Sequence, residues 1–118
     1  MNKKINILIA DDNPNVCQTL KDILSEKGYL VETVMDGYDV LAYLKKNLPH
    51  IIILDLMMPN KDGAEIISSI KSIAPNTKII IYTAFSRYEG SMYASTVDKF
   101  LLKSGNPENL LQAIEELG

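Results

Sequence analysis

Three acidic residues, a threonine and a lysine each stand at the end of an apolar run, where a strand would leave the core. Asp11 and Asp12 follow one run, Asp55 follows a second, and Thr83 and Lys103 end two more. A carboxylate at the end of a buried strand is costly unless a partner binds it. Three carboxylates in one crevice would also repel one another, and a divalent cation relieves that repulsion at neutral pH. The arrangement therefore indicates a metal site.

A phosphoryl group would complete such a site, because Mg²⁺ is typically held by one or two carboxylates together with waters and a phosphate oxygen. Lys103 supplies a compact positive charge for that phosphate, and Thr83 supplies a hydroxyl donor. Asp55 could then be the nucleophile, since an aspartate can form an acyl phosphate when a cation neutralises the developing charge. In the purely structural alternative, the neighbouring aspartates only cap the first helix and Lys103 only pairs with Asp55. That alternative leaves the placement of Asp55 unexplained.

Five apolar runs predict the strands that would carry these residues, at 5–10, 29–34, 50–54, 78–83 and 100–102. The run into Asp55 is apolar on consecutive residues, as expected of a central parallel strand covered on both faces. Residues 85–96 contain Gly90 and several serines and predict only a short or mobile helix. Four clearer helices are predicted: from Asn13-Pro14 to Gly28, over Val40, Leu41, Leu44 and Leu48 up to Pro49, from Gly63 to Pro75, and from Asn106-Pro107 to Leu117.

Five strands that alternate with five helices imply an α/β fold, a doubly wound parallel sheet with helices on both faces. Right-handed crossovers leave few strand orders, and 2-1-3-4-5, the flavodoxin-like (βα)5 arrangement, is the common one for five strands. The functional crevice of such a sheet lies beyond the carboxyl ends of its strands. We therefore expect one domain, residues 1–118, whose polar strand ends converge on a single site.

Composition narrows the choice of partners. The net charge of −3 gives no support for direct nucleic-acid binding or for an anionic membrane surface. No apolar run approaches the ~20 residues of a membrane span, and the run before Asp11 is too short for a signal peptide. Cys17 is the only cysteine, so no intrachain disulfide can form, and its place on an apolar helix stripe predicts a core residue. We expect a cytoplasmic protein.

From Lys4 to Leu117 the chain resembles the receiver domain of two-component response regulators, the CheY-like family. The matching residues are the acidic pair Asp11-Asp12, Asp55 with Met58-Pro59 and Gly63, Thr83-Ala84, and Phe100 three residues before Lys103. The resemblance implies that Asp55 accepts phosphate from a sensor histidine kinase or a histidine phosphotransfer protein. It implies Mg²⁺, or Mn²⁺, held directly by Asp12 and Asp55, largely through water by Asp11, and by the backbone carbonyl of Met57.

The same resemblance implies a switch. Thr83 and Phe100 would report phosphorylation to the surface formed by residues 85–96, 100–102 and 107–117, and hence to an unknown downstream protein or fused output domain. Helix residues Asn15, Gln18, Thr19 and Asp22 could face the phosphodonor, although as solvated positions they carry no independent signal. The chain would be no enzyme for external substrates, and would catalyse only its own phosphorylation and dephosphorylation.

Several positions depart from the family pattern. Ser104 replaces the usual proline after the lysine, and a cis bond without proline costs ~2.5–4 kcal/mol, so we expect this bond to be trans. Thr96 replaces a common glycine. Met57 and Phe85 are apolar at the two positions that modulate hydrolysis in the family, which predicts slow loss of phosphate.

Rival functions have specific objections. A phosphatase of the haloacid dehalogenase type needs a second acid two residues after the nucleophile, and Met57 stands there. A flavodoxin-like FMN binder needs a phosphate-cradling loop, where Asp11-Asp12 would repel phosphate. The remaining alternative is a pseudo-receiver, an interaction module that works without phosphorylation because Ser104 displaces Lys103. His50 is expected to be a polar residue at a strand edge, and Tyr88, Met92 and Tyr93 could equally form a partner surface or none.

Overall fold

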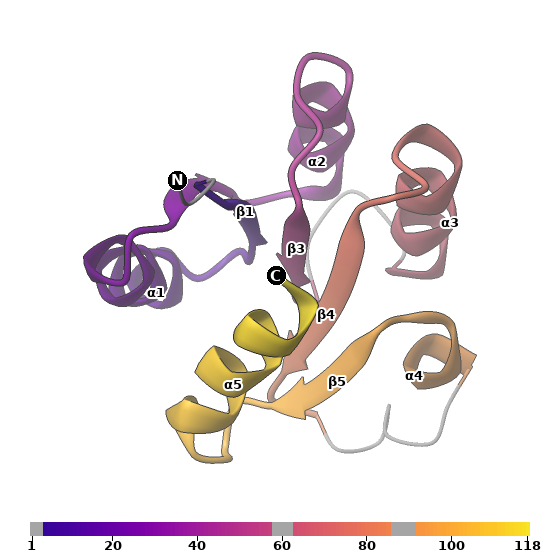
Figure 1. Cartoon of the computed structure of the whole chain (residues 1–118). Helices are drawn as coiled ribbons and strands as arrows, with labels where there is room; N and C mark the ends of the chain where they lie inside the picture. Colours follow the sequence, from indigo (N-terminus) through magenta and orange to yellow (C-terminus); the bar gives the residue numbers. More distant parts are fainter. Residues whose placement is uncertain (1–3, 58–62, 86–91) are drawn as a thin grey trace.

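The computed structural model describes residues 4–57, 63–85 and 92–118 of the chain. Strands and helices alternate along it (Figure 1). In chain order they are β1 (Asn6–Ala10), α1 (Pro14–Glu26), β2 (Leu30–Val34), α2 (Gly37–Leu44), β3 (Ile51–Leu54), α3 (Gly63–Ile73), β4 (Lys78–Thr83), α4 (Met92–Thr96), β5 (Lys99–Leu102) and α5 (Pro107–Leu117).

The five strands form one parallel sheet in the order β2-β1-β3-β4-β5, which confirms the predicted fold. Ala10 pairs with Leu54, and Leu54 pairs with Ile81, so β1, β3 and β4 end close to one another at the same edge. The Asp55 N–H extends this pairing, because it donates to the carbonyl of Ala10 at 2.9 Å. The register therefore brings the residues after β1 and β3 side by side.

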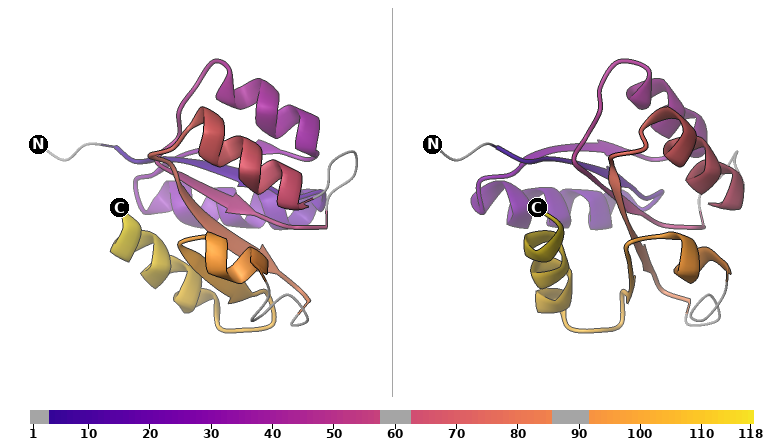
Figure 2. Two further views of the ribbon diagram at one scale, coloured as in Figure 1. Left: turned by 90° about the vertical axis from the view of Figure 1, so that its right-hand side faces the viewer. Right: turned by 45° about the vertical axis from the view of Figure 1, so that its right-hand side comes forward.

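Helices cover both faces of the sheet, which explains why the central strands are apolar at consecutive residues (Figures 1 and 2). Ile7 and Ile9 face α1 and α5, and this layer also contains Cys17. Leu8 and Ala10 face the opposite core, against α2 and α3. In the right-hand view of Figure 2, α5 and α4 lie on opposite sides of the sheet. None of the helices in the described part of the chain is long and apolar enough to cross a bilayer.

Local signals set the helix ends largely as predicted. The Asn13 side chain caps α1 by accepting the N–H groups of Asn15 and Val16, and Pro14 follows at the first helical position. Gly28 has φ of 95°, a left-handed conformation that favours glycine and turns the chain toward β2. Asn106 and Pro107 repeat the same start at α5.

The prediction that the second helix extends to Leu48 is wrong. The α2 helix ends at Leu44, and Leu48 is 65% exposed. Helical conformation is disfavoured before a proline, and here the chain already tightens at Lys46, whose N–H bonds the carbonyl of Tyr43. The expectation for residues 85–96 is only partly testable: α4 covers Met92–Thr96, whereas 86–91, with Tyr88 and Gly90, lie outside the described residues.

Candidate functional site

The predicted acidic residues gather at the carboxyl edge of the sheet. Asp11 and Asp12 follow β1, and Asp55 follows β3, its neighbour in the sheet. One carboxylate oxygen from each of the three lies within 4.8 Å of the others. Asp11 and Asp55 are only 3% and 7% exposed, whereas Asp12 is exposed to solvent. The cluster, called the acidic pocket below, thus combines two buried carboxylates with one exposed carboxylate.

Lys103 bridges the two buried carboxylates. Its Nζ donates to Asp11 Oδ2 at 2.6 Å and to Asp55 Oδ2 at 2.9 Å. Burial disfavours the charged amine, but the hydrogen bonds to both carboxylates and their negative charges outweigh it and raise the pKa of Lys103. The sequence predicted the approach to Asp55 but not the shorter contact with Asp11.

The backbone around Lys103 explains how the side chain reaches the pocket without the usual proline. The Lys103 N–H donates to the carbonyl of Thr83 at 2.7 Å and so continues the pairing of β4 with β5. The described residues contain no cis peptide bond, so the bond to Ser104 is trans, as expected. The exchange of proline for Ser104 therefore does not remove Lys103 from the acidic pocket.

Backbone N–H groups hold the remaining oxygens of the buried carboxylates. Asp11 Oδ1 accepts from Asn13 N at 2.9 Å, and Asp55 Oδ1 accepts from Met57 N at 3.0 Å. Asp12 has no hydrogen bond or ion pair with another residue in the described ranges. Because Asn13 caps α1, helix capping does not account for this exposed carboxylate. The purely structural alternative is therefore only half right: the ion pair of Lys103 with Asp55 exists, but the acidic pair does not cap α1.

The donor set fits a hard divalent cation. All the side-chain ligands on offer are carboxylate oxygens, which Mg²⁺ and Mn²⁺ prefer. Asp12 is exposed to solvent, and a Mg²⁺ site commonly retains waters and a phosphate oxygen among its ligands. The Cys17 thiol is engaged elsewhere, because its Sγ donates to the backbone carbonyl of Asp11 at 3.3 Å. Burial and the Asp11 carboxylate raise the pKa of Cys17, as suits a core thiol.

Thr83 and Phe100 occupy the same pair of neighbouring strands. Thr83 is fully buried, and its Oγ1 accepts the N–H of Phe85 at 3.3 Å. Phe100 pairs with Ile81 and packs, partly buried, against the core below α2 and α3. Alternate residues of β4 share a face, so Thr83 points to the same side as Ile81 and thus toward the layer of Phe100.

The remaining residues named from the sequence are partly described by the structure. Met57 and Phe85 are exposed by 41% and 40% at the rim of the pocket. His50 is an exposed residue at the strand edge, as expected, and its Nδ1 accepts the N–H of Asn6 at 3.0 Å. Met58, Pro59 and Tyr88 lie outside the described residues, as do the side chains of Met92 and Tyr93.

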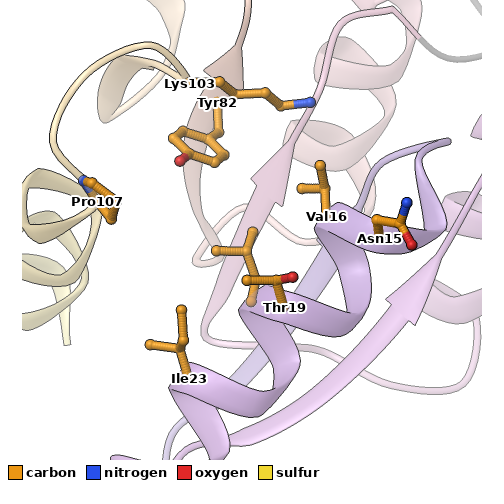
Figure 3. A pocket seen from close by; sticks show the side chains of 8 residues that line it. Asn15, Val16, Thr19, Ile23, Tyr82, Lys103 and Pro107 are labelled. Carbon is orange, nitrogen blue, oxygen red and sulfur yellow. The ribbon is translucent and has the colours of Figure 1, made fainter.

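A groove of about 300 Å³ opens beside Lys103, between α1 and the start of α5 (Figure 3). Its α1 wall includes Val16, Thr19 and Ile23, and Pro107 lines the opposite side. Tyr82 is 9% exposed, and its hydroxyl points into this space. Burial raises the pKa of that phenol. The sequence did not reveal Tyr82, because a tyrosine inside a buried strand gives the same signal as any core aromatic.

Comparison with known proteins identifies the family. The model of the response regulator receiver domain matches residues 7–115. The chain belongs to this family. The receiver is 36% identical over 121 residues to the uncharacterized transcriptional regulatory protein YxjL of Bacillus subtilis, with 97% of this chain and 55% of that protein covered. It is 32% identical over 117 residues to protein PilG of Pseudomonas aeruginosa, with 94% of this chain and 85% of that protein covered.

Solved structures agree with this assignment. The response regulator TrrA of Thermotoga maritima in complex with Mg²⁺-BeF matches this receiver with a TM-score of 0.89 and 32% identity, over 97% of this chain and 99% of that one. TrrA in complex with the histidine kinase ThkA matches with a TM-score of 0.87 and 33% identity, over 96% of this chain and 97% of that one. The receiver spans about half the length of YxjL, 55%, and 35% of the MprA response regulators of Mycobacterium. It is a receiver of two-component signal transduction.

Proposed function

We propose that Asp55 is the phosphoacceptor of this receiver, in a reaction that depends on Mg²⁺ or Mn²⁺. The observation that carries the proposal is the position of Lys103, whose Nζ is hydrogen-bonded to Asp55 within an otherwise acidic pocket. A pocket that combines clustered carboxylates with one buried ammonium suits a transferred phosphoryl group, whose oxygens need positive charge from both sides. The structure of TrrA in complex with Mg²⁺-BeF supports the same interpretation.

In the proposed reaction, an Oδ atom of Asp55 attacks the phosphorus of a phosphohistidine. The new O–P bond forms as the P–N bond breaks, and the imidazole nitrogen keeps the electron pair. Lys103 and the Thr83 hydroxyl stabilise phosphoryl oxygens. Asp11, Asp12, Asp55 and the carbonyl of Met57 would hold the cation, which supplies charge neutralisation for the incoming phosphate. The Met57 N–H fixes the Asp55 carboxylate by its 3.0 Å bond to Oδ1.

The phosphodonor we propose is a sensor histidine kinase or a histidine phosphotransfer protein, acting in the cytoplasm. The kinase complex of TrrA supports this class of partner. In this receiver, the groove beside Lys103 would be covered by that partner, because Lys103 itself lines it and its α1 wall includes the apolar residues Val16 and Ile23. Asn15 and Thr19, two of the four predicted donor-facing residues, line the groove.

Phosphorylation would act through Thr83 and Phe100. Movement of the Thr83 hydroxyl toward the phosphoryl group would vacate space on the face where Phe100 packs. Rotation of Phe100 would then alter the surface of α4, β5 and α5, which an unknown downstream protein or output domain would read. A pseudo-receiver that works without phosphate requires Lys103 to be displaced. The contacts of 2.6 and 2.9 Å at its Nζ argue against that alternative.

The test is incubation with acetyl phosphate, with and without Mg²⁺, followed by intact-mass measurement and phosphate-affinity electrophoresis. We expect one phosphoryl group per chain, which requires Mg²⁺ and is absent from Asp55→Asn. Asp22→Asn is the matched control, because Asp22 lies on α1, is not part of the acidic cluster, and accepts a hydrogen bond from the Gln18 side chain. Modification that persists in Asp55→Asn, or none in the wild type, would refute the proposed phosphoacceptor.

A further inference from the structure

Tyr82 is a core residue of β4 whose side chain ends in the groove between α1 and α5. It is only 9% exposed and packs in the core layer under these two helices. Figure 3 shows its hydroxyl directed into the groove, between the α1 wall and Pro107. No residue that the structure describes forms a hydrogen bond with this hydroxyl. Every fully buried polar side-chain atom in the described ranges has a partner, so the Tyr82 oxygen is one that the groove reaches.

Core packing explains the ring of Tyr82 but not its hydroxyl. A phenylalanine would fill the same space without a polar atom, and a buried tyrosine hydroxyl normally has a hydrogen-bond partner. A purely apolar surface that covered the groove would leave this hydroxyl buried and unpaired, which is unfavourable. The groove therefore suits an occupant that brings a hydrogen-bonding group of its own.

The groups that line the groove favour an uncharged side chain in the occupant. Asn15 offers an amide and Thr19 a hydroxyl, and the one charged lining residue, Lys103, has its Nζ bonded to two carboxylates. A charged occupant would lose hydration without gaining a free counter-charge among these residues. Burial raises the pKa of Tyr82, so its phenol keeps the proton that it can donate. Since the other lining residues are apolar, the side chain that fits is an amide or hydroxyl on an apolar stem.

We infer that Tyr82 is a specificity-determining contact for the phosphodonor protein, and that its hydroxyl donates to an amide or hydroxyl side chain of that protein. The inference rests on the proposed role of Asp55 as phosphoacceptor and adds a criterion for which donors can serve it. Lys103 both lines the groove and bonds Asp55, so a protein that brings a phosphohistidine to Asp55 also covers the groove. A small donor such as phosphoramidate leaves the groove uncovered. The hydroxyl therefore selects among protein donors without taking part in phosphoryl transfer.

Phosphotransfer to Tyr82→Phe tests this role, because the variant loses only the hydroxyl. The protein donor is the histidine kinase that phosphorylates the wild type fastest in a panel of autophosphorylated kinase domains, and the small donor is phosphoramidate. With the kinase, we expect kcat/KM to fall about 5- to 150-fold through a higher KM at unchanged kcat, because a hydrogen bond of the bound complex is lost. With phosphoramidate, the rate should stay unchanged. Kinase kinetics equal to those of the wild type, or an equal loss with both donors, would overturn the inference.

Tyr43→Phe is the matched control. Tyr43 lies on α2 and packs, partly buried, against the core on the opposite face of the sheet, and its hydroxyl likewise bonds none of the described residues. Its substitution should change transfer from neither donor. Urea unfolding should give the same stability for Tyr82→Phe as for the wild type, because no hydrogen bond of the free receiver is removed. A clear loss of stability would show that the hydroxyl serves the fold, and would overturn the inference.

Phosphoramidate also separates this inference from the proposed function. If it fails to modify the wild type, the role of Asp55 as phosphoacceptor is refuted. If it modifies Asp55 while no kinase of the panel transfers phosphate, the phosphoacceptor stands and the role of Tyr82 as a donor contact is refuted.

Discussion

We expect the substitution Thr83→Val to weaken the proposed switch while leaving the stability of the fold nearly unchanged. Valine keeps the shape of threonine, so the fully buried position stays filled and only the hydroxyl is lost. The bond that disappears is the 3.3 Å contact from Phe85 N, and Phe85 is 40% exposed, so water can replace Oγ1 as the acceptor. We therefore expect the free energy of unfolding to change by no more than about 1 kcal/mol.

The cost in the phosphorylated state should be larger. A hydrogen bond from the Thr83 hydroxyl to a charged phosphoryl oxygen is worth about 1.5–3 kcal/mol. Its loss reduces the switched population by roughly 10- to 150-fold relative to the resting one, at about 1.4 kcal/mol for each factor of ten. Urea unfolding of the unmodified proteins and the response of Phe100 to beryllofluoride with Mg²⁺ measure the two effects separately.

Fluorophenylalanine labelling suits this assay, because the chain has only two phenylalanines, Phe85 and Phe100. The Phe100 signal should shift with beryllofluoride in the wild type and respond far less in Thr83→Val. Thr77→Val is the matched control: Thr77 Oγ1 donates to the buried carbonyl of Pro49 at 2.7 Å, so its loss should cost about 1–3 kcal/mol of stability. The switch should be intact in that variant. A full Phe100 response in Thr83→Val would refute the coupling.

Three further predictions concern phosphate lifetime, donor access and pH. Met57→Asn should shorten the half-life of phospho-Asp55 several-fold, measured by electrophoresis after removal of acetyl phosphate, because an amide can orient water where the thioether cannot. Thr19→Arg should slow transfer from a histidine kinase by about tenfold or more, through a charge in the groove, while acetyl phosphate still works. The raised pKa of Lys103 means that its stabilising contribution is complete at neutral pH. It is lost as the pH rises above the ordinary lysine value of about 10.4, so urea unfolding should show a steeper alkaline decline in wild type than in Lys103→Met.

Much of the fold was predictable because its signals are local. Consecutive apolar residues in β1 and β3 mark strands covered on both faces, and the pairs Asn13-Pro14 and Asn106-Pro107 mark helix starts. The end of α2 was not predictable from hydrophobic spacing. Leu48 continues the helical spacing, yet its side chain is 65% exposed, and helical conformation is disfavoured before Pro49.

The membership of the site was predictable for a different reason. Parallel strands deliver their carboxyl ends to one edge, so Asp11, Asp55 and Lys103 had to converge once the strand order was right. Their detailed pairing was not predictable. The approach of Lys103 to Asp11 depends on side-chain conformations and on the N–H groups of Asn13 and Met57 that orient the carboxylates. The spacing of residues in the sequence does not specify side-chain conformations or these hydrogen bonds.

The hydrogen bond from Lys103 N to Thr83 O links the two strands that carry the proposed switch. The two residues proposed to contact phosphate are joined by this 2.7 Å bond, in strands that also pair Ile81 with Phe100. Reversal of a two-state population from 1:99 to 99:1 needs about 5.5 kcal/mol of differential interaction. One Thr83 hydrogen bond, at about 1.5–3 kcal/mol, cannot supply that alone. The remainder must come from the other groups proposed to meet the phosphoryl group, Lys103 among them. Because β4 and β5 are bonded at this point, the contributions of Thr83 and Lys103 act on one structural unit.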